Sequence, residues 1–156
     1  MTLPLALRPA RSGEAAALTA LVERAYAPWV PVVGRRPAPM DDDYAARIAA
    51  GQVLVQDGPD GAPAALLVLE DRPGHLWLDN IALDPARQGT GLGRALMAFV
   101  EAEARRRGFG EVRLLTNALM ARNIALYARL GYRETDRRGE HGFQRVYMAK
   151  TLPPVS

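Results

Sequence analysis

The chain has 156 residues, of which 49% are hydrophobic and 24% are charged, and its formal net charge at pH 7 is +3. A chain of this length and composition can bury the core of one domain. It contains no cysteine, which excludes disulfides, thiolate metal sites and a cysteine nucleophile.

Membrane and nucleic-acid partners are disfavoured. No stretch approaches the roughly 20 apolar residues of a membrane span, and residues 1–11 lack the apolar run of a signal peptide. The pI of about 9.7 would permit nucleic-acid binding. However, the arginines are scattered, and the tight run Arg105 to Arg107 ends a predicted helix, where cations suit the helix dipole. We therefore expect a cytoplasmic protein with no membrane and no nucleic-acid partner.

The first third of the chain is predicted to be mainly helical. Its expected elements, in chain order, are a strand at 5–8, a helix at 12–27, an irregular loop at 28–40 and a helix at 41–50. Apolar residues recur at helical spacing in the first helix, and Pro28 stops it. The acids Asp41 to Asp43 favour a helix start through the dipole, and we do not interpret them as a metal site.

The remaining sequence alternates strands and helices. Its expected elements, in chain order, are strands at 52–56, 64–70 and 75–83, a helix at 92–107, a strand at 112–116, a helix at 121–130 and strands at 132–137 and 143–150. The helix at 92–107 forms a crossover, so the strands on either side of it should be parallel. We therefore expect one α/β domain over residues 1–156, with a mostly antiparallel sheet, one central parallel pair and about four helices.

The most informative stretch is a glycine-rich turn between a predicted strand and a predicted helix. Glycines let a ligand approach the backbone closely, and the free N–H groups of a first helical turn attract an anion. This combination predicts a phosphate-binding turn. The P-loop pattern fails because Gly-Lys-Ser/Thr is absent, and the spacing G-x-G-x-x-G fails because Arg94 stands at the sixth position from Gly89.

The pattern that fits is Gln-x-x-Gly-x-Gly, formed by Gln88, Gly91 and Gly93. A second block follows at Asn123, with Leu-Tyr ending at Tyr127 and Leu-Gly-Tyr ending at Tyr132. Together the two blocks resemble the signatures of the GNAT superfamily of N-acetyltransferases, and the order of elements is similar over the whole chain.

The resemblance implies a fold in which the parallel pair splays and coenzyme A lies in the gap. Backbone groups of the first strand would then bind the pantetheine arm, and the turn would bind the pyrophosphate. The cofactor-binding residues implied in this way are Ile81, Ala82, Leu83, Gln88, Gly89, Thr90, Gly91, Leu92, Gly93, Arg94, Asn117 and Asn123. Arg87 could add a charge-assisted bond to the same group.

The resemblance also implies that Tyr127 is catalytic. It follows Asn123 by four residues, so the two share a helix face. In the family this tyrosine protonates, or donates a hydrogen bond to, the departing thiolate. Some members place a glutamate where this chain has Trp77, which cannot act as a base. The base could instead be Glu70 or Asp79, or the amine could arrive already neutral and need no base, and these alternatives stay open.

The acceptor is less constrained than the cofactor. The resemblance implies transfer of an acetyl group from acetyl-CoA to a primary amine of a small molecule or peptide, in a ternary complex, without a metal and with a homodimer as one possible assembly. Trp29, Arg35 and Arg36 could line the acceptor pocket, or a buried Trp29 could simply anchor the loop while both arginines are solvated. The alternatives to an enzyme are a coenzyme A-binding module without turnover and a basic nucleic-acid-binding protein.

Overall fold

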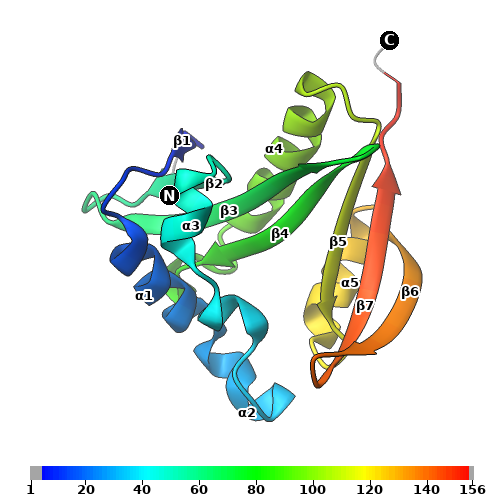
Figure 1. Cartoon of the computed structure of the whole chain (residues 1–156), viewed down its shortest axis with the longest axis horizontal. Helices are drawn as coiled ribbons and strands as arrows, with labels where there is room; N and C mark the ends of the chain where they lie inside the picture. Colours follow the sequence, from blue (N-terminus) through cyan, green and yellow to red (C-terminus); the bar gives the residue numbers. More distant parts are fainter. Residues whose placement is uncertain (1–4, 155–156) are drawn as a thin grey trace. The chain divides into compact units, whose positions relative to one another are not determined.

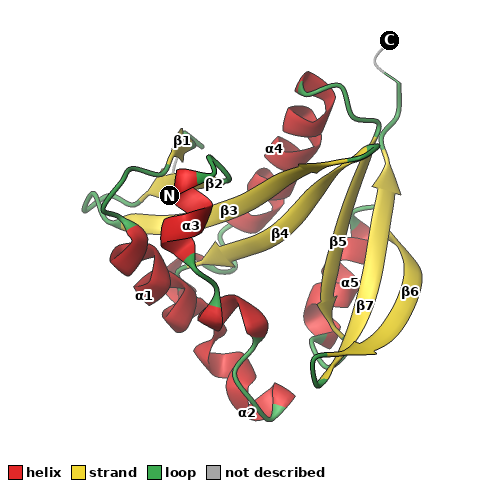
Figure 2. Cartoon of the chain, viewed as in Figure 1, coloured by secondary structure: helices red, strands yellow, loops and turns green. Residues whose placement is uncertain are grey.

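The computed structural model describes residues 5–154, which Figure 1 colours along the chain and Figure 2 colours by secondary structure. Its α-helices are α1 (Ala15–Tyr26), α2 (Val30–Val33), α3 (Tyr44–Ala49), α4 (Leu92–Arg106) and α5 (Ala121–Arg129). Three short 3₁₀ turns are η1 (Ala27–Trp29), η2 (Ala38–Asp41) and η3 (Pro85–Arg87). The strands are β1 (Arg8–Pro9), β2 (Val53–Asp57), β3 (Pro63–Arg72), β4 (His75–Leu83), β5 (Glu111–Asn117), β6 (Arg133–Glu140) and β7 (Phe143–Thr151).

The strands form one seven-stranded sheet in the order β1-β2-β3-β4-β5-β7-β6. The pairs β1–β2, β2–β3, β5–β7 and β6–β7 are antiparallel. In contrast, β4 and β5 are parallel, with Leu76–Leu78 in register with Val112–Leu114. The connection between these two strands contains α4, as a parallel pair requires. The expected α/β class, with a mostly antiparallel sheet and one central parallel pair, is confirmed for the described residues.

The chain divides into two compact units, and each is described by itself. The first unit comprises Met1–Leu69 and Asn80–Phe99, and the second comprises Glu70–Asp79 and Val100–Ser156. We expected a single domain over residues 1–156, and this range extends beyond the described residues. The expectation that residues 1–11 lack a signal peptide also lies partly outside them.

In the first unit, α1 and α3 pack on one face of the strands (Figure 1). The buried side chains of α1 recur at helical spacing, as the sequence predicts. The cluster that they form with the strands consists of Leu18, Leu21, Val22, Ala25, Met40, Tyr44, Val53, Val55, Leu66, Val68 and Ala82. Because Ala82 belongs to this cluster, the helical layer supports the end of β4.

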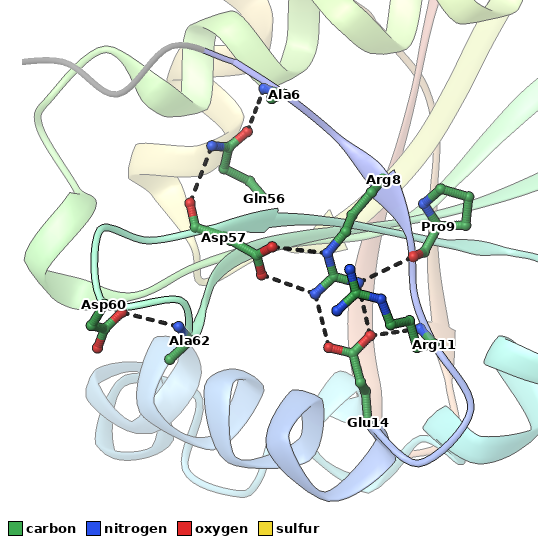
Figure 3. Close-up of polar contacts among 9 residues, drawn as sticks. All are labelled: Ala6, Arg8, Pro9, Arg11, Glu14, Gln56, Asp57, Asp60 and Ala62. Carbon is green, nitrogen blue, oxygen red and sulfur yellow. Dashed lines mark hydrogen bonds and ion pairs between the residues drawn. The ribbon is translucent and has the colours of Figure 1, made fainter.

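One arginine fastens β1 to the rest of the first unit (Figure 3). The Arg8 guanidinium donates to both carboxylate oxygens of Glu14, at 2.8 and 2.9 Å, and to both oxygens of Asp57, at 2.9 Å each. Glu14 also accepts the backbone N–H of Arg11 at 2.6 Å. The hydrogen bonds from Arg8 are the main reason that the pKa of Glu14 falls to about 2. The network joins β1, β2 and the start of α1.

In the second unit, alternate residues of the central strands are buried. Val112, Leu114 and Thr116 of β5 are buried, and the residues between them are not, as a strand covered on one face requires. β6 lies at the edge of the sheet and is exposed along its length except at Glu140, which is partly buried. Charged residues occupy six of its eight positions, RETDRRGE.

Two expected elements differ from the structure. The strand expected at 5–8 forms ladder pairs only at Arg8–Pro9. The segment 28–40, expected to be an irregular loop, contains α2 and parts of η1 and η2. Proline is tolerated in a first helical turn, where its missing N–H has no intrahelical role, and each of these three turns has a proline there. Gly34, with a φ of 86°, then ends α2.

Candidate active site

The turn between β4 and α4 is built around two left-handed glycines. Asp84, directly after β4, caps η3 by accepting the backbone N–H two residues further on at 3.0 Å. Gly89 and Gly91 have φ angles of 76° and 88°, which residues with a Cβ rarely adopt. Thr90, between them, donates its hydroxyl to the carbonyl oxygen of Arg87 at 2.5 Å. The turn is therefore closed by its own bonds and reverses the chain into α4.

The turn that leads into the amino-terminal end of α4 is open to solvent. Residues 88–91 are exposed, and the N–H of Ala95 donates to the carbonyl oxygen of Gly91 at 3.1 Å. The N–H groups of Leu92 to Arg94 precede this bond, so they have no carbonyl acceptor within the helix. They add to the positive end of the dipole of a 15-residue helix, and this end can hold an anion.

Two arginines border the same turn. Arg94 is exposed and Arg87 is partly exposed. Within the part of the chain that the structure describes, neither guanidinium has a hydrogen-bond or ion-pair partner. Both are therefore able to bind an anion without first breaking an existing ion pair.

The end of β4 alternates between the two faces of the sheet. Asn80 and Ala82 are buried, whereas Ile81 and Leu83 are partly exposed. The strand continues into the turn through the N–H of Asp84, which donates to the carbonyl oxygen of Ala64 on β3 at 2.8 Å. The first unit thus brings the expected residues 81–83 and 88–94 together at one end of β4.

A buried polar chain next to this strand end was not predicted from the sequence. The Tyr26 hydroxyl donates to Asn80 Oδ1 at 2.6 Å, and Asn80 Nδ2 donates to the Tyr44 hydroxyl at 3.1 Å. The Tyr44 hydroxyl in turn donates to the carbonyl oxygen of Pro39 at 2.6 Å. Asn80 is only 4% exposed. The chain ties α1, η2 and α3 to the residue that directly precedes Ile81.

The second unit holds the other expected site residues. Asn117 ends β5, and its side-chain oxygen accepts the N–H of Leu119 at 2.9 Å. Its carbonyl oxygen accepts the N–H of Met120, and the carbonyl oxygen of Met120 accepts the N–H of Asn123 at 3.0 Å. The Asn123 amide contacts the sulfur of Met120 at 3.6 Å, a weak acceptor. Most of its hydrogen-bonding capacity is therefore available to a ligand.

Tyr127 is one turn further along α5, on the same face as Asn123. The residue is 8% exposed, and burial raises the pKa of its phenol to about 12. Among the described residues the hydroxyl has no hydrogen-bond partner. The hydroxyl is not a fully buried unpaired atom, so its hydrogen-bonding capacity is available to a ligand.

Comparison with known protein families gives a match over most of the chain. Residues 18–132 match the model of the acetyltransferase (GNAT) family. The chain belongs to the GNAT family. This matched region contains both the glycine-rich turn and Tyr127.

Individual relatives agree with the GNAT assignment. The ribosomal protein bS18 alanine N-acetyltransferase of Escherichia coli is 41% identical over 81 residues, which cover 52% of this chain and 53% of the relative. The match thus spans about half the length of this relative. The crystal structure of the Escherichia coli enzyme has a TM-score of 0.74 at 23% identity, covering 97% of this chain and 96% of that one. The PaiA N-acetyltransferase of Thermoplasma acidophilum, in complex with coenzyme A, has a TM-score of 0.79 at 14% identity, covering 96% and 100%.

The carboxylates considered as bases of this GNAT chain are engaged in other bonds. Trp77 is buried, and its indole N–H donates to the Asp79 carboxylate at 3.1 Å. The Glu70 carboxylate accepts from Arg72 at 2.7 Å. His75 is 8% exposed, and burial is the main cause that lowers its pKa. These contacts lie within β3 and β4. We therefore assign neither carboxylate as the base.

The segment between α1 and α3 is anchored by Arg36. Its guanidinium donates to Glu23 at 2.6 Å, to Asp41 at 3.0 Å and to the carbonyl oxygen of Met40 at 3.2 Å. The Arg36 side chain is still 47% exposed, so it pairs with these acids while keeping contact with solvent. Trp29 is partly buried, and Val32 on α2 is 50% exposed.

The range of residues 5–154 has no group of three or more His, Asp or Glu side chains able to hold a metal ion. None of its helices is both long enough and apolar enough to span a membrane.

Proposed function

We propose that this chain transfers the acetyl group of acetyl-CoA to a primary amine of a small molecule or peptide. The observation that carries the proposal is the turn at Gln88–Arg94, which is exposed at residues 88–91 and presents free amides at the start of α4 in a chain of the GNAT family. Acetyl-CoA supplies a thioester whose carbonyl carbon is open to attack by a nucleophile.

The turn is proposed to bind the pyrophosphate of coenzyme A. The N–H of Gln88 already donates to the carbonyl oxygen of Pro85 at 3.3 Å, so within Gln88–Arg94 the amides from Gly89 to Arg94 would donate to phosphate oxygens, which helix amino-termini favour. Arg87 and Arg94, both without an ion-pair partner, would add charge-assisted bonds.

The end of β4 is proposed to bind the pantetheine arm. Pantetheine contains amides, so backbone groups of Ile81, Ala82 and Leu83 can pair with it as a strand pairs with a neighbour. The buried bonds of Asn80 hold this segment in place. Asn117 and Asn123 are proposed to contact the same cofactor.

Tyr127 is proposed to assist departure of the thiolate. As the amine nitrogen bonds to the carbonyl carbon, the C–S bond breaks and negative charge develops on sulfur, while the amine loses a proton. A reference thiol has a pKa of about 8.5, and the pKa of Tyr127 is about 12. Full proton transfer from the phenol would be uphill by roughly 3.5 units, or about 5 kcal/mol. Tyr127 therefore acts as a hydrogen-bond donor to the developing charge.

Peptide amines are the first acceptors to test. The relative at 41% identity is named for an alanine of a ribosomal protein, which supports a peptide amino-terminus, and small-molecule amines form the second group. A cytoplasmic location and a homodimer stay predictions from the sequence.

The proposal is tested in two steps on the full chain. Saturating acetyl-CoA should raise the unfolding midpoint, and a panel of peptides and small amines should then be screened for release of free thiol. Release with at least one amine is expected. Stabilisation without any release of thiol would favour a coenzyme A-binding module. The absence of both stabilisation and thiol release would overturn the proposal.

A further inference from the structure

Tyr127 and Tyr132 are in direct contact at the end of α5. The backbone N–H of Tyr132 donates to the carbonyl oxygen of Tyr127 at 3.0 Å. Their rings meet edge to face, with centroids 6.0 Å apart and planes at 63°. Edge-to-face pairs of this kind are a favoured aromatic geometry. Tyr132 therefore packs against one side of the Tyr127 ring and restricts the orientation of that ring.

Tyr132 is held in turn by an ion pair. Its hydroxyl donates to Glu101 Oε2 at 3.5 Å, and Glu101 Oε1 accepts from Lys150 Nζ at 2.9 Å. The Lys150 ammonium also lies 5.9 Å from the centroid of the Tyr132 ring, within the range of a cation–π contact. Glu101 of α4 and Lys150 of β7 thus both contact Tyr132, which lies in the turn between α5 and β6.

Gly131 gives Lys150 room to reach Glu101. A Cβ placed on Gly131 would lie 3.2 Å from Lys150 Cε, and the φ of this glycine is 97°. The glycine thus ends α5 in a left-handed conformation and lets the lysine stem cross its backbone. In the Leu-Gly-Tyr block, the glycine therefore leaves space for Lys150, and the tyrosine contacts Tyr127.

The Tyr127 hydroxyl has no bonded partner among the described residues, so the direction of its O–H depends on how its ring is packed. A displacement of about 1 Å in a reacting group can cost about a hundredfold in rate. We propose that Tyr132, held by the Glu101–Lys150 pair, is a positioning residue that directs the Tyr127 hydroxyl. This inference rests on the proposed function of Tyr127.

A double-mutant cycle separates positioning from a general structural effect. Tyr132→Leu removes the ring contact and is expected to lower kcat for thiol release about tenfold, with the KM for acetyl-CoA within about twofold of wild type. In the Tyr127→Phe background the same change is expected to lower kcat less than about twofold. An equal loss in both backgrounds would overturn the inference.

Two further variants test the ion pair. Glu101→Gln removes the charge that holds Tyr132 and is expected to lower kcat about threefold or more by loosening the ring. Glu103→Gln is the matched control, because Glu103 lies on the same helix but pairs with Arg106 and Arg107, and it should leave kcat unchanged. Equal effects of the two variants would contradict the inference.

A measurement that needs no activity keeps the inference testable if Tyr132→Leu loses too much stability to assay. With tyrosines labelled by ¹³C at Cζ, the Tyr127 resonance should shift or broaden in Glu101→Gln and stay unchanged in Glu103→Gln. An unchanged resonance in both would overturn the inference. A wild-type chain that releases no thiol with any amine would instead overturn the proposed function, whatever the resonance does.

Discussion

Gly93 faces Leu83 across the turn that joins β4 to α4, and a Cβ built on Gly93 would have Leu83 Cδ2 as its nearest neighbour at 3.8 Å. This is ordinary van der Waals contact, and the φ of Gly93 is outside the left-handed region. The fold alone therefore gives no reason for glycine at this position. The proposed pyrophosphate site would give one, because a ligand there approaches the backbone closely.

Gly93→Ala should consequently separate stability from binding. Alanine favours a helix over glycine by up to about 1 kcal/mol, so the unfolding midpoint should stay the same or rise. Affinity for coenzyme A, measured by calorimetry, should fall about tenfold or more, because the added methyl obstructs the amides. Gly110→Ala is the matched control, since nothing lies within 4 Å of a Cβ there and its φ is also ordinary. Unchanged affinity in Gly93→Ala would argue against pyrophosphate binding at this turn.

Tyr127→Phe should lower kcat with little change in affinity for acetyl-CoA. The ring packing is retained and only the hydrogen bond to the departing sulfur is lost, so we expect about a hundredfold decrease. Because the pKa of the wild-type phenol is about 12, it stays protonated at ordinary assay pH. The wild-type pH–rate profile should therefore show no alkaline decline caused by Tyr127 below pH of about 11. A variant with wild-type kcat would remove Tyr127 from the chemistry.

The Arg8 network should make stability depend on acid pH. The pKa of Glu14 is lowered to about 2 in the folded chain from its ordinary value of 4.5. The contribution of Glu14 to the free energy of unfolding is therefore fully present above a pH of about 4.5 and decreases as the pH falls toward 2. Urea unfolding should show Glu14→Gln destabilised by about 2 kcal/mol at pH 7, and this difference should shrink at pH 3. A difference that is constant between the two pH values would contradict the assigned pKa.

Asn80→Leu should destabilise the first unit. The variant keeps the side-chain size but removes the acceptor of Tyr26 and the donor to Tyr44. Loss of such buried bonds costs about 2 kcal/mol, equivalent to a decrease of about 4–8 °C in the unfolding midpoint. Calorimetry of the variant checks this, and an unchanged midpoint would show that the polar chain is not needed for stability.

Long periodic elements and the glycine-rich turn could be predicted from the sequence. The apolar spacing of α4 and α5 and the crossover between β4 and β5 follow from local patterns that need no knowledge of distant residues. The residues of the turn follow in the same way, because glycine spacing and a helix start lie within a few positions of one another. Short turns inside 28–40 were missed because prolines there start helical turns as well as end them.

The supporting contacts could not be predicted, because they join residues far apart in the chain. Asn80 bonds to Tyr26 across 54 positions, and Lys150 bonds to Glu101 across 49. An asparagine in a strand or a lone lysine near the chain end carries no local pattern that indicates its partner. Only the tertiary arrangement reveals that these residues support the segments to which the sequence assigns chemistry.

The charge pattern of β6 has a consequence for how this chain meets others. An edge strand with unpaired backbone groups is a template on which another polypeptide can add as an intermolecular ladder. Lining that edge with arginine, glutamate and aspartate makes such addition costly, since an incoming strand would have to desolvate those charges. Aggregation through this border is thereby opposed by the same residues that keep it hydrated.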